Sequence, residues 1–482
     1  MKNKNAASSE HSKVTRREIL VLAIVIAGAF IAILNQTVLS PALPKLMEDF
    51  QITAGTAQWV TTIYLLVNGI MVPITAFLID RYPTRKLFIV SLLSFIVGTA
   101  LTGGAPNFGL LIIGRILQAI GAGVQLPLVA VIPMIIFPVE KRGTAMGMAG
   151  IVMSCAPAVG PVVAGWIIDA FGWRMMFWSI LPLAVILLVV SVIFLTNVGE
   201  LKHPHLDIFS VVLSTLAFGG LLYGFSNASN MGWVSPLVLL PLIIGAIALI
   251  CFIRRQFHIK EPLLELRVLK TPKFAYSAII VTVINSALSA GSIVLPLYLQ
   301  NVLGLSAFQT GMLMMPGAAA SIIVSPLSGM LFDKFGPRII SIIGLLGLTG
   351  ALTGLAFIGP ATPIPYLVCI YVLQSAGLTL ANMPVNTWGL NALKNEYIAH
   401  GNAISNTGRQ VGGSISTAII VTIMTMVTTA HQSAGPVLSA ASGIRAAYGV
   451  SAGVAAVALV VAILKVWPDK SKTGLKTKTE AV

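Results

Sequence analysis

The chain has 482 residues, of which 56% are hydrophobic and only 9% are charged, whereas a soluble domain carries roughly 25% charged residues. The apolar residues occur in blocks of about 20, the helix length that crosses a hydrocarbon core of about 30 Å, so the composition excludes a water-soluble protein and predicts an all-α polytopic membrane protein. The net charge of +15 is spread over short loops rather than gathered on one face, which argues against a nucleic-acid partner.

The N-terminal residues 1-18 are polar and basic and are expected to form a cytoplasmic tail. The apolar block that follows has no small-residue cleavage site, which favours a retained first helix over a removed signal peptide. Similar blocks continue along the chain and predict fourteen membrane spans, but twelve remain if 207-254 is reentrant or interfacial. The approximate bounds are 19-39, 56-79, 86-104, 109-132, 144-168, 173-195, 207-227, 235-254, 273-298, 308-331, 338-358, 364-388, 403-428 and 445-466.

The distribution of basic residues predicts the orientation, because Lys and Arg concentrate in cytoplasmic loops. With the N-terminus inside, twenty-five of the 30 basic residues lie on the inner side, and three, Lys45, Arg174 and Arg445, lie outside. The remaining two, Arg115 and Arg409, fall within spans. We therefore expect a multi-pass protein of the cell membrane with both termini in the cytoplasm.

Two segments recur at nearly the same spacing. AFLIDRYPTR (76-85) reappears as GMLFDKFGPR (329-338), and RILQAIGAG (115-123) resembles YVLQSAGLT (371-379), at offsets of 253 and 256 residues. The repeat indicates a duplicated half, and paired halves with a binding site at their interface are a recurrent plan of secondary transporters. The predicted regions are an N-terminal six-helix half 19-195, an inserted helix pair 207-254, a cytoplasmic linker 255-272, a C-terminal six-helix half 273-466 and a cytoplasmic tail 467-482.

The first repeated segment resembles the Gly-x-Leu-x-Asp-Arg-x-Gly-Arg-Arg motif of the major facilitator superfamily, and the resemblance extends over nearly the whole chain. The carboxylate of such a turn can cap a neighbouring helix end in one conformation and release it in another. A plain charged turn is the alternative for one copy, and two registered copies argue against it. The copies read Ala76, Leu78, Asp80, Arg81, Pro83, Arg85, Lys86 and Gly329, Leu331, Asp333, Lys334, Gly336, Arg338.

Two more spans resemble motifs of the family. The family's Arg-x-x-Gln-Gly pattern is matched in the fourth span by Arg115, Gln118, Gly121 and Gly123. A buried arginine is costly in hydrocarbon and faces a partner or a wet cavity, unless it snorkels to an interface. The Gly-Pro signature of proton-coupled drug exporters is matched in the fifth span by Ala156, Pro157, Gly160, Pro161 and Gly165. Packing alone is the alternative explanation for these small residues.

The span count, the segment from Leu34 to Pro44 and the segment from Asn406 to Gln410 together resemble the EmrB/QacA branch of multidrug exporters, of the lincomycin-resistance type. The resemblance implies proton-driven antiport of amphiphilic drugs by alternating access. It also implies a proton gradient in place of a cofactor, with drugs, protons and the lipid bilayer as partners, and we expect a functional monomer. The residues expected to act in switching and coupling are Asp80, Arg81, Arg85, Arg115, Gln118, Gly160, Pro161, Gly165, Asp333, Lys334, Arg338 and Arg409.

The chain departs from this branch at Asn35, where many members have Asp, and none of its acidic residues lies mid-membrane. The candidates for carrying a proton are Asp80, Asp333, Asp169, Glu396 and His400. Without a carboxylate to balance a desolvated cation, a cavity of amide and aromatic side chains suits neutral or weakly basic amphiphiles. An interhelical hydrogen bond is the alternative role for each candidate. The candidate cavity residues are Asn35, Gln36, Tyr64, Asn68, Gln125, Asn285, Tyr298, Asn382, Asn386, Trp388, Asn406 and Gln410.

Other protein classes are disfavoured by what the sequence lacks. It has no Gly-x-x-x-x-Gly-Lys-Ser/Thr loop for ATP, and no acidic pair or accessible histidine cluster inside a span, so an intramembrane enzyme is not expected. Cys155, Cys251 and Cys369 show no metal-ligand or disulfide spacing. A sensor would need an appended soluble domain. The nearest alternative is a lipid or cell-wall precursor flippase on the same fold.

Overall fold

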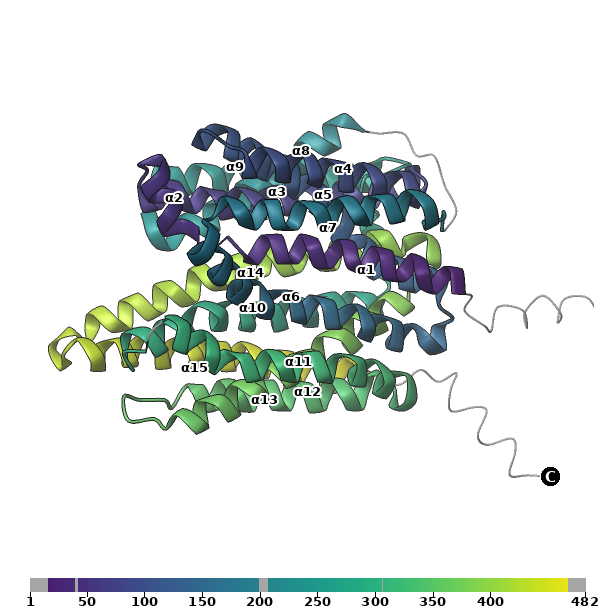
Figure 1. Cartoon of the computed structure of the whole chain (residues 1–482). Coiled ribbons are helices and arrows are strands. Elements are labelled where there is room, and N and C mark those ends of the chain that lie inside the picture. The colour runs from purple at the N-terminus through teal and green to yellow at the C-terminus, as the bar shows by residue number, and fades with distance from the viewer. Residues whose placement is uncertain (1–15, 40–41, 199–206, 306, 467–482) are drawn as a thin grey trace, which may run out of the picture.

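The computed structural model describes residues 16–39, 42–198, 207–305 and 307–466, and these residues form long helices with no strand among them. The helices lie alongside one another in one elongated bundle (Figure 1). The predicted all-α fold class is confirmed. In chain order the helices are α1 Arg16–Thr37, α2 Leu43–Phe50, α3 Ala54–Arg81, α4 Thr84–Gly103, α5 Phe108–Ile136, α6 Arg142–Phe171, α7 Arg174–Phe194, α8 Ile208–Met231, α9 Pro236–His258, α10 Pro272–Asn301, α11 Ala307–Phe335, α12 Pro337–Leu355, α13 Ile364–Asn391, α14 Ile398–Ala430 and α15 Pro436–Lys465.

The length and apolar composition of these helices suit a membrane. Within the described residues, twelve helices are long and apolar enough to cross one. Two further helices, α6 and α10, have 30 residues each and include positions whose side chains the structure does not describe. The total of fourteen spans therefore stays a prediction.

Most of the long helices extend beyond the apolar blocks that predict them, and for α3 and α11 the extension includes motif residues. α3 ends at Arg81 rather than near residue 79, and α11 ends at Phe335 rather than near residue 331. Asp80, Asp333 and Lys334 consequently lie in last helical turns, not in loops. The backbone hydrogen bonds of a helix form within the helix whatever its side chains are, so the helix can continue beyond the apolar segment.

A short helix, α2, follows α1 and has no counterpart in the sequence prediction. The carboxylate of Asp49 in α2 accepts hydrogen bonds from Trp173 Nε1 and Arg174 Nη1, both at 2.8 Å. The bond from Trp173, with help from Arg174, holds the pKa of Asp49 below its ordinary value. Helix α2 thus fixes the connection between α1 and α3 against the connection between α6 and α7.

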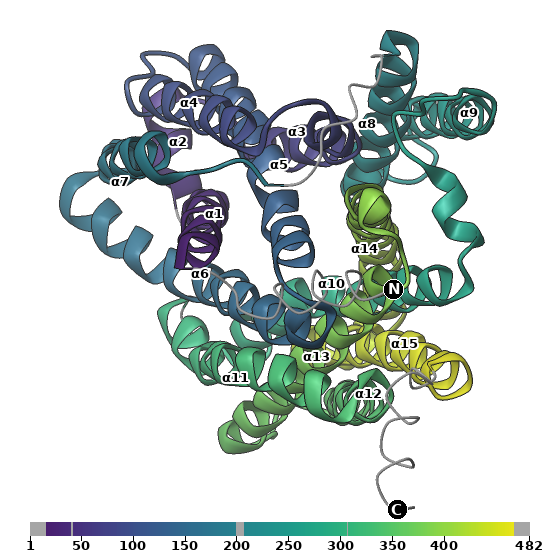
Figure 2. The ribbon, with the colours of Figure 1, turned by 90° about the vertical axis from the view of Figure 1, so that its right-hand side faces the viewer.

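The buried apolar side chains form two large, separate clusters. One draws on residues 21–195 and the other on residues 280–466. We call α1–α7 the N-terminal group and α10–α15 the C-terminal group; Figure 2 shows the bundle end-on. Each group therefore has its own core, and a smaller apolar cluster, which includes Met134, Met146 and Phe274, joins the two groups.

Helices α8 and α9 form an inserted pair that contacts both groups. Helix α8 packs against α3 of the N-terminal group and α14 of the C-terminal group. Tyr223 of α8 stacks on Trp59 of α3 with ring centroids 5.5 Å apart. Trp233 Nε1, beyond α8, donates to Thr422 Oγ1 of α14 at 2.8 Å. The pair is therefore part of the bundle and not a detached appendage.

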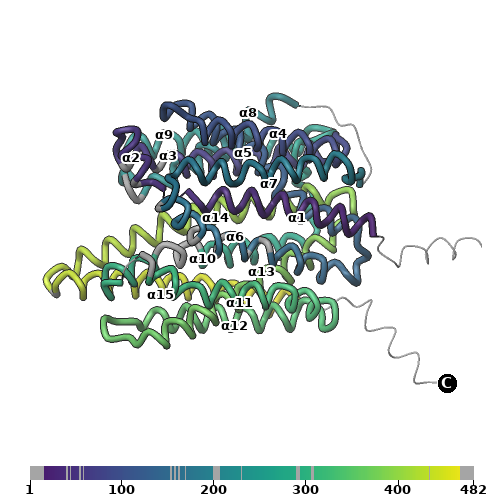
Figure 3. The backbone as a smooth tube through the Cα atoms, in the orientation of Figure 1, coloured from purple at the N-terminus to yellow at the C-terminus, as the bar shows by residue number. Residues whose placement is uncertain are grey.

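The start of α1 and the end of α15 lie at the same end of the bundle (Figures 1 and 3). We call this end the terminal face and the other end the opposite face. Successive long helices alternate in direction, so α3, α11 and α13 end at the terminal face, whereas α6, α10 and α14 begin there.

An ion pair joins the two helices of the inserted pair at the terminal face. Asp207, just before α8, accepts hydrogen bonds from Arg255 Nε at 2.7 Å and Arg255 Nη2 at 3.0 Å. The hydrogen bond from Arg255 is the main cause that lowers the pKa of Asp207 from 3.8 to about 2. Ionised Asp207 therefore stabilises the fold above about pH 4, and this stabilisation is lost as the pH falls from about 4 towards 2.

We expect D207N to lower the melting temperature of the purified protein in detergent by roughly 1–2 °C at pH 7, because partly exposed ion pairs contribute little stability. The difference between wild type and D207N should shrink as the pH falls from about 5 to about 2, as measured by scanning fluorimetry. The matched control R254Q removes the neighbouring exposed arginine and should leave the melting temperature unchanged. A difference that does not depend on pH would contradict this account.

Candidate functional site

A cavity of about 330 Å³ lies between the N-terminal and C-terminal groups. Helices α3, α5 and α6 line one side, and α10, α11, α13 and α14 line the other. Small-molecule sites span roughly 300–1,000 Å³, so the cavity is large enough for a small ligand. Its lining residues are Asn68, Val72, Leu126, Pro127, Val129, Ala130, Met146, Ala149, Gly150, Met153, Asn285, Ser325, Leu378, Thr379, Asn382, Met383, Asn386, Asn406, Arg409 and Gln410.

Half of the predicted cavity residues line this cavity, all of them amides. Amides both donate and accept hydrogen bonds, and the neighbouring methionines Met146, Met153 and Met383 adapt to irregular apolar shapes. The site can therefore hold the polar and the apolar parts of one small molecule. The six amides are Asn68, Asn285, Asn382, Asn386, Asn406 and Gln410.

Four predicted cavity residues of the N-terminal group do not line the cavity: Asn35, Gln36, Tyr64 and Gln125. Asn35, Tyr64 and Gln125 are at most 1% exposed. The Tyr64 hydroxyl donates to the Ala32 carbonyl at 3.0 Å and so joins α3 to α1. Tyr64 thus serves the packing of α3 on α1, whereas the amide atoms of Asn35 and Gln125 are buried without a hydrogen-bond partner among the described residues.

Tyr298 also lies away from the cavity. Its hydroxyl donates to the carbonyl of Gly359 at 2.8 Å and so fixes the last turn of α10 to the connection after α12. The side chain is fully buried. Its role is to hold the C-terminal group together.

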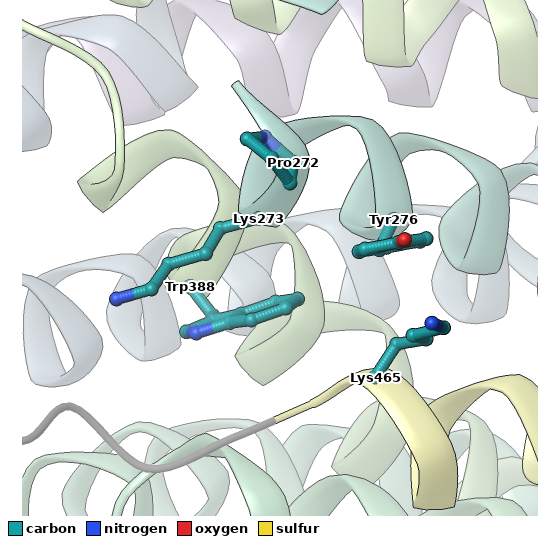
Figure 4. Close-up of a pocket in the computed structure, with 5 residues that line it drawn as sticks. All are labelled: Pro272, Lys273, Tyr276, Trp388 and Lys465. Atoms are coloured by element: carbon teal, nitrogen blue, oxygen red, sulfur yellow. The ribbon is translucent and has the colours of Figure 1, made fainter. Parts of the chain in front are cut away.

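Trp388 lines a second, separate pocket of about 280 Å³ at the terminal face. Figure 4 shows its indole beside Pro272, Lys273, Tyr276 and Lys465. Lys465 Nζ lies 5.2 Å from the centre of the Tyr276 ring. Because all five residues belong to α10, α13 and α15, this pocket lies within the C-terminal group and not between the groups.

Arg115 is fully buried inside the N-terminal group and neither lines the cavity nor snorkels. Its Nε donates to the Val60 carbonyl at 3.2 Å and its Nη1 to Gln118 Oε1 at 2.8 Å. Its guanidinium carbon lies 4.3 Å from the centre of the Tyr64 ring. Gln118 donates in turn to Thr99 Oγ1 at 3.0 Å. Arg115 thus joins α3, α4 and α5, and no carboxylate among the described residues pairs with it.

Asp333 at the end of α11 binds the start of α6 in the other group. Its Oδ1 accepts from Gly143 N at 3.0 Å, and its Oδ2 accepts from Thr144 N at 2.8 Å and from Thr144 Oγ1 at 2.6 Å. The first N–H groups of a helix lack partners within the helix and carry partial positive charge. Helix α6 has no side-chain cap of its own. The carboxylate of the second motif copy therefore caps a helix of the opposite group.

Small residues let α6 and α11 approach closely beside this contact. A Cβ on Gly329 would collide with the Gly143 carbonyl, and a Cβ on Gly143 would collide with the Asp333 carboxylate. Ser325 Oγ donates to the Gly147 carbonyl at 2.9 Å. Close backbone approach through small residues is a common way for membrane helices to associate. Gly329 can be recognised from the sequence as part of a motif, but its partners on α6 cannot.

Asp80, at the end of α3, makes the corresponding contact with the start of α14. His400 Nε2 donates to Asp80 Oδ2 at 3.2 Å, while His400 Nδ1 accepts the backbone N–H of Glu265 at 3.2 Å. The side chains of His400 and Asp80 are only 8% and 13% exposed. One donated and one accepted bond require a neutral imidazole with its proton on Nε2. His400 therefore joins α14 to both α3 and the segment before α10.

The two contacts are related by the internal repeat. Asp80 and Asp333 are 253 residues apart, and Thr144 and His400 are 256 residues apart, which are the offsets of the repeated segments. One copy places a hydroxyl against the carboxylate, whereas the other places an imidazole there. Imidazole is the side chain whose charge changes most readily near neutral pH.

Four other residues that we predict to act in switching lie in the first or last turns of their helices. Arg85 Nη2 donates to the carbonyl of Val192 and so holds α4 to α7, while Lys334 lies over an aromatic ring, 5.3 Å from its centre. Arg81 ends α3, and Arg338 lies in the first turn of α12. These residues lie at the terminal face, where positive charge was expected, and not in the cavity.

The Gly-Pro segment of α6 lies within the N-terminal group. A Cβ on Gly160 would collide with Thr37 Oγ1 of α1, whereas a Cβ on Gly165 would meet open space. The side chain of Pro161 lies outside the described residues, as does that of Asp169. Gly160 therefore serves the close packing of α1 and α6, not the interface between the groups.

Arg142 joins the two groups, a role that the surrounding sequence does not indicate. Its Nη1 donates to Asn391 Oδ1 at 3.2 Å and its Nη2 to Asn395 Oδ1 at 3.0 Å, across from α6 to the end of α13. Arg142 is only 5% exposed. In the sequence Arg142 indicates orientation alone, because a basic residue is expected in any predicted cytoplasmic loop.

Comparisons with known proteins agree with this architecture. The family description Major Facilitator Superfamily matches residues 25–417. A Bacillus subtilis (strain 168) protein named MFS-type transporter YcnB is 44% identical over 454 residues, which cover 94% of this chain and 96% of that protein. Lincomycin resistance protein LmrB of the same strain is 38% identical over 407 residues, which cover 84% of this chain and 85% of that protein. A crystal structure of the human organic anion transporter MFSD10 (TETRAN) is similar with a TM-score of 0.69 at 14% identity, over 92% of this chain and 99% of that chain, a likeness that shows the fold alone.

We expect D333A to increase the fraction of molecules whose terminal face is open. A helix-start contact with a carboxylate stabilises by about 1–2 kcal/mol, so its loss should shift the population roughly five- to thirtyfold towards the open state. The shift can be measured as the rate at which a membrane-impermeant maleimide, applied from the terminal face, modifies a cysteine introduced at the cavity residue Ala149 in a background without native cysteines.

D333N keeps one acceptor oxygen and should have a smaller effect than D333A. The control M330A changes an exposed side chain of the same helix and should label like wild type. Equal labelling rates in wild type and D333A would show that the Asp333 contact does not hold the terminal face closed.

Proposed function

The chain belongs to the Major Facilitator Superfamily, whose members are membrane transporters rather than enzymes, and from this premise we propose that it exports amphiphilic drugs by proton-driven antiport. Its relatives include proteins named for lincomycin resistance and for multidrug resistance. These names support a drug as the transported molecule.

The observation that carries this proposal is the amide-lined cavity between the two groups. It contains no carboxylate among its described lining residues, so a desolvated organic cation would find no counter-ion there. Amides and methionines suit a neutral amphiphile, or a weak base that enters in its uncharged form. Because both groups line the cavity, a rocking motion between them changes the side from which it is reached.

We place the terminal face in the cytoplasm, because the basic residues of the motif turns, of the start of α1 and of the end of α15 lie there. Asp333 and Asp80 then hold the cavity closed towards the cytoplasm in this conformation. Release of these two contacts opens it to the cytoplasm, where a drug can enter. Both termini would lie on the cytoplasmic side of the cell membrane.

The contact between His400 and Asp80 is our candidate for proton coupling. A proton added to His400 would occupy Nδ1, which could then no longer accept the N–H of Glu265. A proton added to Asp80 would weaken its bond to the imidazole. While the added proton stays on His400, the imidazolium binds Asp80 more strongly. When the Nε2 proton passes on to Asp80, the carboxylate becomes neutral, its bond to His400 weakens and the closed terminal face loosens. Proton binding in this state thereby favours opening to the cytoplasm, as antiport requires.

We expect lincomycin to accumulate in proteoliposomes that are acidic inside, with accumulation abolished by an uncoupler and ethidium, a cation, transported far less. H400Q should still exchange lincomycin at equal pH but lose the gradient-driven accumulation. Glutamine can donate to Asp80 and accept from Glu265 as the neutral imidazole does, but it does not titrate. Radiolabelled uptake with and without the gradient separates the two effects.

The comparison variant is E396Q, which removes another predicted proton carrier. Glu396 is 45% exposed and lies 4.0 Å from Lys394, so E396Q should stay coupled. If E396Q loses gradient-driven uptake and H400Q keeps it, the assignment to His400 is wrong. If no gradient moves lincomycin or ethidium, the drug antiport proposal fails as a whole.

A further inference from the structure

The cavity contains a single formal charge among its described lining residues, that of Arg409 on α14. Its Nη2 donates to Asn406 Oδ1, one turn earlier on the same helix. The structure shows no ion pair and no second hydrogen-bond partner for Arg409 among the described residues. An arginine has five N–H donors in a planar fork, so most of its capacity remains available.

Arg409 lies deep in the bundle. It is the twelfth residue of the 33-residue helix α14, which puts it about 17 Å from the terminal end of that helix at 1.5 Å per residue. That is near the middle of a hydrocarbon core of about 30 Å. An arginine at such depth is costly and normally faces a partner or a wet cavity.

The buried arginine of the other group has more partners than Arg409, although its Nη2 makes no hydrogen bond. Arg115 is 0% exposed, and it binds the Val60 carbonyl, the Gln118 amide and the face of Tyr64. Arg409, by contrast, borders open space and has one partner. The fold gives Arg115 a carbonyl, an amide and an aromatic ring as partners, whereas it gives Arg409 one amide and a border on the cavity.

We propose that Arg409 binds an anionic group of the transported molecule, so that the protein takes amphiphilic organic anions beside neutral drugs. The guanidinium fork matches a carboxylate, sulfonate or phosphate with two parallel hydrogen bonds. Asn406 uses its Oδ1 for Arg409, which leaves its amide N–H₂ as a donor to the same group. The apolar body of the ligand contacts Met146, Met153 and Leu378. This inference rests on the proposed transport of small molecules but not on proton coupling.

The positive charge of Arg409 also affects which ligands the cavity prefers. A cationic ligand in this cavity would meet a like charge within a low dielectric and no carboxylate to offset it. A neutral ligand with strong acceptor oxygens can also accept hydrogen bonds from Arg409, but these contribute less binding free energy than those of an anion. Affinity is therefore ordered from organic anions through neutral amphiphiles to organic cations.

The test compares two fluorescent probes that share one ring system and differ by a sulfonate. These are 8-anilinonaphthalene-1-sulfonate, an anion, and N-phenyl-1-naphthylamine, which is neutral. Binding to the purified protein in nanodiscs at one pH is read as energy transfer from tryptophan. We expect R409Q to bind the anion at least about tenfold more weakly than wild type does, because a charge-assisted hydrogen bond is lost, and to bind the neutral probe equally well.

R409K keeps the charge but loses the planar fork, so it should retain part of the preference for the anion. M426A changes an exposed residue of the same helix and should behave like wild type. Unchanged affinity for the neutral probe also shows that R409Q is folded. Should R409Q fail to fold, displacement of the anionic probe from wild type by 1-naphthalenesulfonate but not by 1-naphthalenesulfonamide gives the same information.

The inference is overturned if R409Q binds both probes as wild type does, or if the sulfonamide displaces the probe as well as the sulfonate. Because no pH gradient is applied, a failure of proton-driven uptake leaves this outcome unaffected. Conversely, loss of the anion preference would leave the export of neutral drugs untouched.

Discussion

Carboxylates of one group of helices bind helix starts of the other group, and the conformation of the whole molecule depends on these contacts. Asp333 caps α6, and Asp80 binds His400 at the start of α14. Contacts of this type contribute on the order of 1 kcal/mol each. That is enough to favour one arrangement of two rigid groups and small enough for a ligand or a proton to reverse it.

The inserted pair α8 and α9 adds a surface that both groups share. It packs along α3 and α14, the two helices that Asp80 and His400 also join. On the other flank, α6 and α11 approach through glycines and Ser325. The two sides of the interface therefore differ. On the side of α3 and α14, aromatic residues of the inserted pair contact both groups. On the side of α6 and α11, the helix backbones of the two groups contact each other directly.

The two intramembrane arginines show how tertiary structure assigns different roles to one residue type. Arg115 stabilises a core, because backbone, amide and aromatic partners surround it. Arg409 borders the cavity with one partner, so its charge is available to a ligand. Asn35, where many members of the branch have Asp, is buried in α1 and does not line the cavity.

The sequence by itself determined the class of protein, the positions of its long helices and the internal repeat. These follow from local composition, because a bilayer forces apolar segments into helices of a set length. The repeat also marked Asp80 and Asp333 as related positions, because they lie at the same place in the two copies of the motif. It could not identify the partners of these carboxylates, Thr144 and His400, nor the bridging role of Arg142, because those contacts join residues far apart in the chain.

Only the tertiary structure decided which polar residues face the cavity. Asn35, Tyr64 and Asn68 are all polar residues within apolar blocks, yet the first two are buried between helices and the third lines the cavity. Which way a polar side chain points depends on the packing of neighbouring helices, and that packing is set by contacts from both groups at once. The apolar pattern of a helix buried on most sides carries little information about direction, so the same sequence signal marks a ligand contact and an interhelical hydrogen bond alike.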